Sequence, residues 1–231
     1  MSMNAPTELS VGHGAAMDRM YRFQRHIYDA SRRYYLLGRD ELLDRLKPPP
    51  GGAILEIGCG TGRNLAGAAR RYPDARLFGI DISQEMLKTA LKSAQQNKFL
   101  HRARFACADA TFFYPLPSLG QSKFDRIYFS FTLSMVPDWQ SALRHAASLL
   151  APSGELHILD FGQSNGLPQG LRRMLFHWLD LFHVKPRPNL KSALQQIATE
   201  SGLTLQFEQL YRDYTWLAVI KAKPASQQLA L

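Results

Sequence analysis

The feature that most constrains the fold is a regular alternation of short apolar runs and helical patterns after residue 52. Five runs are typical of strands, at residues 53–57, 76–80, 103–107, 124–129 and 155–161. Three helical patterns lie between them, at residues 63–72, 84–97 and 139–150. Parallel strands need crossover connections of about a dozen residues or more, and helices usually supply them. The alternation therefore predicts an α/β fold, with a mostly parallel sheet covered by helices on both faces.

The segments on either side of this alternation complete the predicted organisation. A helical pattern runs from residue 15 to residue 46, is interrupted near Ser31 or Gly38, and stops at the proline and glycine run of residues 48–52. We therefore expect a helical extension over residues 1–50. At the other end, a predicted helix at 189–201 is followed by strands at 204–210 and 215–221. The turn between these two strands is too short for a parallel crossover, so we expect them to pair antiparallel.

The residue composition excludes several classes of protein. Two cysteines, Cys59 and Cys107, cannot form a disulfide framework or a four-ligand zinc site. His177 and His183 are six residues apart, on different helix faces and near no carboxylate cluster, so no metal site is expected. No stretch approaches about eighteen uninterrupted apolar residues, which excludes a membrane-spanning helix. No signal peptide is recognisable at the N-terminus, so we expect a cytoplasmic protein.

The strongest functional signal lies between the first strand and its following helix, in the sequence Glu56-Ile57-Gly58-Cys59-Gly60-Thr61-Gly62. Glycines at alternate positions let the backbone turn sharply and approach a ligand closely, and the helix N-terminus presents free amides. The alternative is a tight strand-to-helix turn that binds no ligand. The spacing differs from the dinucleotide fingerprint and no Walker lysine follows, so the motif indicates a nucleotide-like ligand of another kind.

Acidic residues follow the next two strands at the same predicted edge of the sheet. Asp81 lies nineteen residues after Gly62, where a carboxylate can accept hydrogen bonds from both ribose hydroxyls. Its alternative role is that of a helix N-cap. Asp109 follows the third strand and can accept from the exocyclic amine of adenine. The candidate cofactor-binding residues are Glu56, Gly58, Cys59, Gly60, Gly62, Asp81, Ile82, Asp109, Ala110 and Ser130.

At these positions the sequence resembles the class I S-adenosylmethionine-dependent methyltransferases. The family's glycine motif matches residues 56–62, its ribose-binding acid matches Asp81 and its adenine-binding acid matches Asp109. The resemblance implies S-adenosyl-L-methionine as the cofactor of a methyltransferase domain over residues 51–231. It also implies a Rossmann-like, seven-stranded sheet, mostly parallel with the last strand antiparallel.

The N-terminal extension carries an unusual set of aromatic and basic residues. Tyr21 and Tyr28 are seven residues apart and share a helix face with Arg25. Such a face can close over the active site, with tyrosine rings toward a sulfonium or a methylated ammonium. The alternative is a helix that packs through its aromatic side chains and exposes its arginines to solvent.

A second unusual segment is an amphipathic insertion at residues 163–188. One predicted helix face carries Leu171, Met174, Leu175, Trp178, Leu179 and Phe182, and the opposite face carries Arg173, His177 and Asp180. Tryptophan and phenylalanine with basic flanks suit a membrane interface, and the net charge of +9 favours anionic lipid. Ordinary docking on the sheet explains the same spacing equally well.

These flanking segments resemble those of the bacterial diacylglyceryl-homoserine N-methyltransferases of betaine lipid synthesis. The resemblance rests on residues 21–39, 56–64 and 157–187. It implies successive methylation of the headgroup amine of diacylglyceryl-homoserine, giving diacylglyceryl-N,N,N-trimethylhomoserine, at the inner face of the membrane. It also makes the enzyme that produces diacylglyceryl-homoserine a candidate partner. Alternatives are a phosphatidylethanolamine N-methyltransferase, a small-molecule or quinone methyltransferase, and a cofactor-binding sensor at the membrane surface that is not an enzyme.

Several residues are candidates for handling such an acceptor. Tyr21, His26 and Tyr28 are candidates for orienting or deprotonating the amine, although an α-amino group with a pKa of about 8 does not require a dedicated base. Candidates for binding the substrate, including its carboxylate, are Arg25, Arg33 and Tyr34, with Arg172, Arg173 and Arg187 as alternatives. A nucleic-acid partner is not expected, because residues 130–133 lack the Asn/Asp-Pro-Pro-aromatic motif of enzymes that methylate base or glutamine amides.

Overall fold

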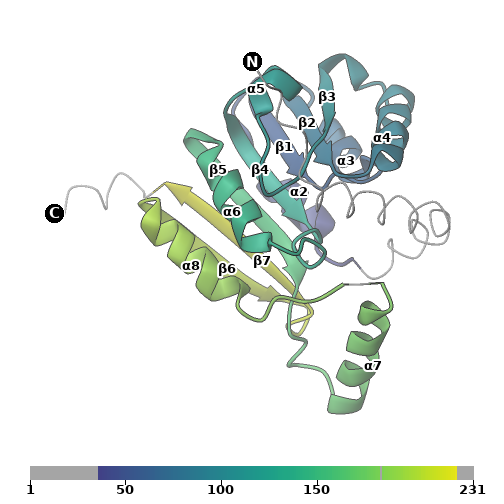
Figure 1. Ribbon diagram of the computed structural model, residues 1–231, viewed down its shortest axis with the longest axis vertical. Coiled ribbons are helices and arrows are strands. Elements are labelled where there is room, and N and C mark those ends of the chain that lie inside the picture. The colour runs from purple at the N-terminus through teal and green to yellow at the C-terminus, as the bar shows by residue number, and fades with distance from the viewer. Residues whose placement is uncertain (1–35, 183, 223–231) are drawn as a thin grey trace.

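The computed structural model describes residues 36–182 and 184–222. Seven strands form one sheet in the order β3-β2-β1-β4-β5-β7-β6 (Figure 1). The strands are β1 (Ala53–Ile57), β2 (Arg76–Asp81), β3 (Ala103–Cys107), β4 (Phe124–Ser130), β5 (Leu150–Phe161), β6 (Leu203–Leu210) and β7 (Thr215–Ala222). Strands β1 to β5 pair in parallel, whereas β7 pairs antiparallel with both β5 and β6. The predicted α/β fold, with its antiparallel last strand, is confirmed.

Helices cover both faces of this sheet. They are α2 (Arg39–Arg45), α3 (Arg63–Arg71), α4 (Gln84–Gln96), η1 (Leu100–Arg102), α5 (Pro115–Leu119), α6 (Trp139–Ser148), α7 (Gln169–Asp180) and α8 (Leu190–Glu200). Alternate strand residues point to opposite faces. One face, with Leu55 and Ile127, packs against α6 and α8. The other face, with Ile54 and Tyr128, packs against α2, α3, α4 and α7.

The connections between strands place the site. From β1 the chain crosses to β2 and β3 on one side, and β4 then pairs with β1 on its other side. In open α/β sheets, ligands bind outside the carboxyl ends of the strands at such a reversal. The carboxyl ends of β1, β2 and β4 are therefore where a ligand is expected.

Two elements differ from the sequence-based prediction. Strand β5 begins at Leu150, five residues before the predicted start, and pairs with β4 across an irregularity between Phe124 and Arg126. Helix α5 was not expected between two strands, yet Pro115 occupies its first turn and Gly120 ends it in the left-handed conformation. The proline and the glycine are local signals of where a helix begins and ends. The helix itself is only five residues long, which is too short for a hydrophobic periodicity to reveal it.

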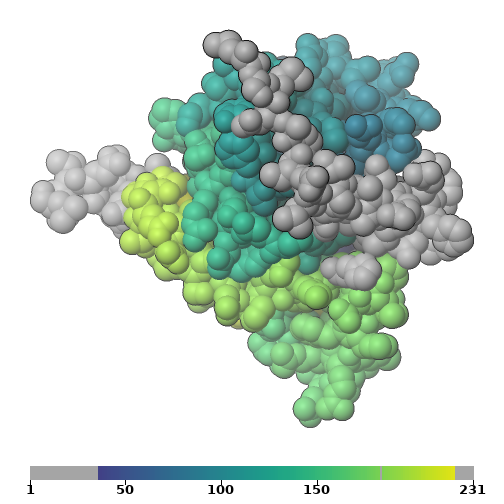
Figure 2. Space-filling view, viewed as in Figure 1, coloured from purple at the N-terminus to yellow at the C-terminus, as the bar shows by residue number. Residues whose placement is uncertain are grey.

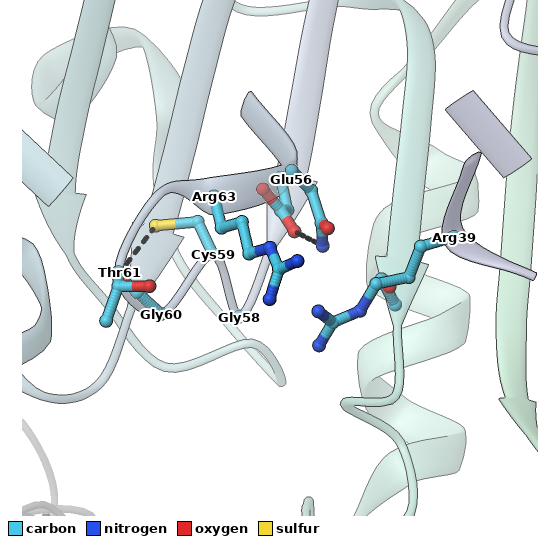
Figure 3. A pocket seen from close by; sticks show the side chains of 9 residues that line it. Arg39, Glu56, Gly58, Cys59, Gly60, Thr61 and Arg63 are labelled. Carbon is cyan, nitrogen blue, oxygen red and sulfur yellow. Dashed lines mark hydrogen bonds between the residues drawn. The ribbon is translucent and has the colours of Figure 1, made fainter. Parts of the chain in front are cut away.

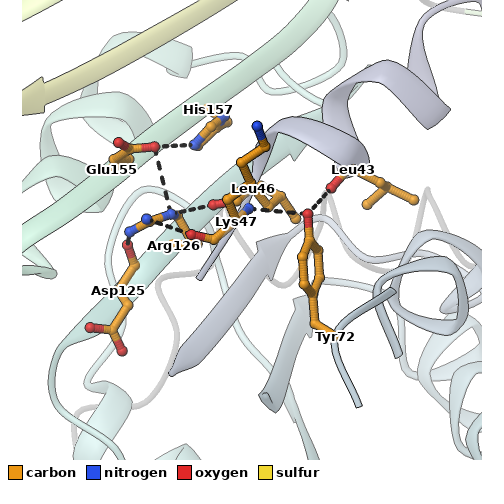
Figure 4. A network of polar contacts seen from close by, with 8 residues as sticks. All are labelled: Leu43, Leu46, Lys47, Tyr72, Asp125, Arg126, Glu155 and His157. Carbon is orange, nitrogen blue, oxygen red and sulfur yellow. Dashed lines mark hydrogen bonds and ion pairs between the residues drawn. The ribbon is translucent and has the colours of Figure 1, made fainter. Parts of the chain in front are cut away.

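Arg126, at the amino end of β4, joins α2 to the sheet (Figure 4). Its guanidinium donates hydrogen bonds to the carbonyls of Leu46 and, at 2.8 Å, Lys47, and lies 3.6 Å from the Glu155 carboxylate. His157 Nε2 lies 3.0 Å from the same carboxylate, and burial lowers the pKa of this histidine. The network fixes the end of the N-terminal extension at the edge of the sheet opposite the carboxyl ends.

Helix α7 lies in the amphipathic insertion, and its predicted apolar face is divided in two. Leu179 is buried, and Leu175, Trp178 and Phe182 pack against the sheet cluster that also contains α2 and α3. The rest of the apolar surface is exposed, with exposed fractions of 52% for Leu171, 65% for Met174 and 63% for Leu181. Figure 2 shows the helix as a lobe that projects from the lower edge of the molecule in this view. Docking on the sheet therefore describes one part of the helix, and the membrane interface stays a prediction for the exposed part.

Both ends of the insertion are attached to the core of the fold. Before α7, the amide of Ser164 donates to the carbonyl of Asp213 at 2.7 Å. After it, Arg187 donates to the carbonyls of Leu133 and Val136 at 3.1 and 2.7 Å. Among the described helices, none is long and apolar enough to cross a membrane.

Candidate cofactor site

The loop that follows β1 is shaped by its glycines and tied to β2. The amides of Gly58 and Cys59 both donate to the carbonyl of Ile80 at 2.9 Å. Gly58 has a φ of +74°, and a Cβ there would lie 2.3 Å from Cγ2 of Thr132, so no larger residue fits. By contrast, within the described part of the chain and apart from its own neighbours in sequence, no atom lies within 4 Å of the Cβ position of Gly60. The loop therefore presents open backbone at Gly60, where a ligand can approach closely.

Asp81, at the end of β2, holds this loop in place. Its Oδ2 accepts from the Gly60 amide at 2.8 Å, and its Oδ1 accepts from the Ser83 amide at 2.9 Å. Each carboxylate oxygen has two lone pairs, so these bonds leave acceptor capacity for ribose hydroxyls. Asp81 is not the N-cap of the following helix, which was its alternative role. The N-cap of α4 is Ser83, whose side chain accepts from the amide of Met86.

Asp109 lies next to Asp81, because the amide of Ala108 donates to the Asp81 carbonyl at 3.0 Å. Its Oδ1 accepts from both the amide and the hydroxyl of Thr111, at 2.8 and 2.7 Å. Oδ2 forms neither of these bonds, so it is the oxygen that suits the predicted contact with an adenine amine. Ile82 and Ala110, the neighbours of these acids, are both half-buried.

A pocket lies beside the glycine loop on the side toward α2 (Figure 3). The lining residues are Arg39, Glu56, Gly58, Cys59, Gly60, Thr61, Arg63, Asn64 and Ser130. Five of these are sequence-predicted cofactor residues, and the fold brings them to one place. Burial raises the pKa of the Cys59 thiol well above its usual range, so this cysteine stays protonated.

Among the described residues that line the pocket, Glu56 carries the one carboxyl group. Its Oε1 accepts from Asn64 Nδ2 at 2.8 Å, and its Oε2 accepts from the hydroxyl of Tyr128 at 3.0 Å. Complete burial raises its pKa to about 8, although both hydrogen bonds and the charge of Arg39 act in the opposite direction. The fully buried Tyr128 hydroxyl thus has a structural role that sequence reasoning missed.

Arg39, Arg63 and Asn64 were also missed as site residues. Asn64 lies eight positions after Glu56, in the first turn of α3, and this spacing is a usable signal. Arg63 directly follows the glycine motif. Arg39 had no such signal, because it belongs to a separate helix and reaches the pocket only through the packing of α2.

The six predicted acceptor residues in the N-terminal extension lie outside the described residues, and their roles stay predictions. They are Tyr21, Arg25, His26, Tyr28, Arg33 and Tyr34. Within the described ranges, no group of three or more His, Cys, Asp or Glu side chains can hold a metal ion.

The arrangement fits an adenosyl ligand with a polar tail. Asp81 and Asp109 offer acceptors at neighbouring strand ends, Gly60 leaves space beside them, and the pocket toward α2 continues from the same loop. The N-terminus of α3 points into this loop from Gly62, which suits a ligand that carries negative charge.

Known proteins with similar sequences are methyltransferases. Residues 54–154 match the family described as Methyltransferase domain. An O-methyltransferase of Pyrenophora dematioidea is 34% identical over 70% of this chain and 58% of its own length. The O-methyltransferase rstn1 of Aspergillus nomiae is 31% identical over 72% and 77%, respectively. A trans-aconitate 2-methyltransferase of Delftia acidovorans is 36% identical over 51% and 41%. The chain thus spans little more than half the length of the first of these relatives.

Solved structures share the fold at low sequence identity. The YcgJ protein of Bacillus subtilis superposes with a TM-score of 0.61 and 16% identity, over 81% of this chain and 99% of that one. Phosphoethanolamine N-methyltransferase 2 of Haemonchus contortus, in complex with S-adenosyl-L-methionine, gives a TM-score of 0.63 and 18% identity, over 80% and 52%. With the glycine loop, Asp81 and the sequence relatives, these findings show that the chain belongs to the class I methyltransferases, the family whose cofactor is S-adenosylmethionine.

Proposed function

We propose that this protein is an enzyme that transfers a methyl group from S-adenosylmethionine to a nucleophilic acceptor. The observation that carries the proposal is the 2.8 Å hydrogen bond between the Gly60 amide and Asp81. This bond joins the loop after β1 to the carboxyl end of β2 and leaves the backbone at Gly60 accessible, which suits an adenosyl group.

The residues of the chain serve this reaction mainly by binding and alignment. When bound, the cofactor supplies a methyl group that is already activated by a sulfonium. Asp81 would hold the ribose and Asp109 the adenine, and the glycine loop would allow close contact. An in-line transfer then needs an acceptor held at short distance and away from water.

For the acceptor we propose a lipid headgroup amine, that of diacylglyceryl-homoserine, with phosphatidylethanolamine as the alternative lipid. The support is the surface of α7, where Leu171, Met174 and Leu181 are exposed and Arg172 and Arg173 lie beside them. This combination suits binding at an anionic membrane surface. The enzyme that makes diacylglyceryl-homoserine is then the partner that supplies the substrate.

A second candidate is methyl transfer to oxygen. Relatives are named O-methyltransferase or trans-aconitate 2-methyltransferase, and these names favour a hydroxyl or carboxylate acceptor. A cofactor-binding sensor without transfer activity is the non-enzyme alternative.

One experiment separates these functions. The protein is incubated with methyl-labelled S-adenosylmethionine and extracts of cells that do or do not express the enzyme making diacylglyceryl-homoserine. We expect label in the organic phase that depends on this enzyme and that mild alkali does not release as methanol, because N-methyl groups are stable in alkali. Label released by alkali as methanol indicates a carboxylate acceptor instead. Binding of the cofactor without any transfer in either extract would favour the sensor.

A further inference from the structure

The loop after β4, residues 131–137, packs directly against the glycine loop. The side chain of Thr132 occupies the space beside Gly58, since a Cβ on that glycine would lie 2.3 Å from Thr132 Cγ2 and 2.8 Å from its Oγ1. The backbone turns at this point, because the amide of Met135 donates to the Thr132 carbonyl at 2.9 Å. A movement of the loop after β4 therefore changes the surroundings of the glycine loop.

The amide groups of this loop are held by the end of β5. Phe131 has a φ of +56°, a conformation that a residue other than glycine keeps only where its surroundings hold it. Its amide donates to the carbonyl of Leu159 at 2.7 Å. The amide of Ser134 donates to Oδ2 of Asp160 at 3.1 Å, and this carboxylate is 1% exposed. One side of the loop is thus fixed to the sheet.

The carbonyl groups of the loop are held from elsewhere, by the segment that leads from α7 to α8 (Figure 1). Arg187 donates from Nε to the carbonyl of Leu133 at 3.1 Å and from Nη2 to the carbonyl of Val136 at 2.7 Å. Between these two bonds, the amide of Lys185 donates to the carbonyl of Ser134 at 2.9 Å. The segment after α7 therefore supplies donors to three carbonyls of the loop.

The surroundings of Arg187 commit its side chain to this loop. Two of its three guanidinium nitrogens donate to the loop carbonyls, and the side chain is half-buried. Its Cζ lies 6.0 Å from the ring centroid of Trp139, the first residue of α6, which suits a cation–π contact. The sequence made Arg187 an alternative for binding a substrate carboxylate, whereas its hydrogen bonds hold backbone. It also lies outside the matched residues 54–154.

We propose that Arg187 is a positioning residue of the methyl-transfer site, which holds the loop after β4 so that the acceptor meets the cofactor in line. The inference rests on the proposed function and deepens it. In-line transfer requires short distances, and a displacement of about 1 Å can lower a rate about 100-fold. Arg187 acts through the loop, whose Thr132 contacts Gly58, and not on the reacting atoms. Alignment at the site then depends on docking of the segment after α7.

The first measurement tests the loop and needs no acceptor. Hydrogen exchange with mass spectrometry follows the amides of residues 132–136 in protein saturated with S-adenosylhomocysteine. In Arg187→Met these amides should exchange at least about tenfold faster than in the parent, because the loop opens more often. Arg144→Met is the control, since it removes an equal charge from the exposed surface of α6. Its loop amides should exchange like those of the parent.

The second measurement tests alignment. Labelled methyl groups are transferred from saturating S-adenosylmethionine to a total extract of cells that express the enzyme making diacylglyceryl-homoserine, and calorimetry gives the cofactor affinity. Arg187→Met should bind the cofactor within about threefold of the parent, because Asp81 and Asp109 are unchanged, yet transfer methyl groups at least about tenfold more slowly per folded molecule. Arg144→Met should match the parent in both measurements.

Arg187→Lys completes the series and serves as the main variant if Arg187→Met does not fold. A lysine keeps the charge, but its ammonium lacks the planar fork with which arginine reaches both carbonyls. The transfer rate of Arg187→Lys should therefore lie between those of the parent and Arg187→Met, again with intact cofactor affinity. A rate equal to that of the parent, with loop exchange equal to that of the parent, would contradict the proposal in this variant.

The remaining outcomes separate the two levels of the argument. Unchanged exchange in Arg187→Met overturns the inference, since other contacts would then hold the loop. Faster exchange with an unchanged transfer rate also overturns it, because the loop would then not align the acceptor. A rate that falls only in proportion to cofactor affinity does the same, since Arg187 would then support cofactor binding alone. If the parent binds the cofactor but transfers no label to the extract, the proposed function fails and the inference fails with it.

Discussion

Asp81 combines two tasks in one side chain. Its oxygens hold the amides of Gly60 and Ser83, and the same carboxylate faces the position expected for the ribose. The loop after β1 therefore depends on Asp81 for part of its shape.

We predict that Asp81→Ala weakens S-adenosylmethionine binding by about 1–3 kcal/mol, because ribose hydroxyls and loop amides lose a charged acceptor. Calorimetry on the purified variant measures this change. Asp74→Ala, which removes an exposed carboxylate in the turn before β2, is the control and should bind as the parent does. Unchanged affinity in Asp81→Ala would remove this residue from the site.

Glu56 makes stability depend on pH. In the folded state its pKa is about 8, raised mainly by burial, whereas an unfolded glutamate has its ordinary value of 4.5. Between these values the folded state binds more protons than the unfolded state, so its contribution to stability falls as pH rises. Arg39, Asp81, Tyr128 and Cys59 are the charged or titratable groups that influence this carboxyl group.

We predict that Glu56→Gln removes this dependence. Between pH 6.5 and 7.5, the parent should lose about 1.4 kcal/mol of unfolding free energy relative to the variant, which is the value of one pH unit. Urea unfolding of both proteins at the two pH values measures the difference. A constant difference would mean that Glu56 is ionised in the folded protein throughout this range.

At the scale of elements, α7 stands out among the described helices because it exposes two large apolar side chains, those of Leu171 and Met174. Trp178 and Phe182 are partly buried and pack against the sheet cluster. Their rings also contact each other, with centroids 5.1 Å apart. Replacing them would disturb the core as well as any surface. A test of membrane contact must therefore use the exposed residues.

We predict that Leu171→Ser with Met174→Ser lowers flotation with anionic vesicles at least about tenfold, because each buried apolar side chain contributes about 1.5–3 kcal/mol. Binding of the parent should fall with added salt, since each nearby Lys or Arg adds about 1 kcal/mol on an anionic surface. Leu91→Ser with Leu116→Ser removes comparable exposed side chains from α4 and α5 and should float like the parent. Equal flotation of both double variants would show that α7 does not contact the bilayer.

Some of these elements could be predicted from the sequence and others could not. The strands next to the site were predictable because β1 and β2 are short apolar runs bounded by glycine and aspartate, and Asp81 followed from its distance to Gly62. The division of α7 was not predictable, since the same spacing describes a helix docked along all or only part of its length. Arg39 was not predictable either, because its place depends on contacts of α2 with α3 and β5 that are distant in sequence.

At the scale of the whole molecule, Arg126 is one of the side chains that connect α2 with the sheet. This side chain satisfies the carbonyls of Leu46 and Lys47 at the end of α2 and faces Glu155 of β5. Arg39 at the start of α2 lines the pocket at the carboxyl ends of the strands. By holding the other end of α2, Arg126 therefore also helps to position Arg39.

We predict that Arg126→Met lowers the unfolding free energy by about 1.5–3 kcal/mol, because carbonyl groups at the end of α2 lose a charged donor. Chemical denaturation measures this loss. Arg144→Met, on the exposed surface of α6, removes an equal charge and should leave stability within about 0.5 kcal/mol of the parent. A loss no greater than that of the control would indicate that the other contacts of α2, with α3 and the sheet, hold it without Arg126.

The sheet order has a consequence for how the chain is made on a ribosome. Strand β7, the last described strand, lies between β5 and β6. Until it has been synthesised, β5 has an open edge whose N–H and C=O groups pair with nothing, and β6 has no neighbour in the sheet at all. Unpaired edges attract other chains. The nascent protein should therefore need a chaperone most between the emergence of β5 and that of β7, when much of the sheet already exists but the strand that closes the gap has not yet emerged.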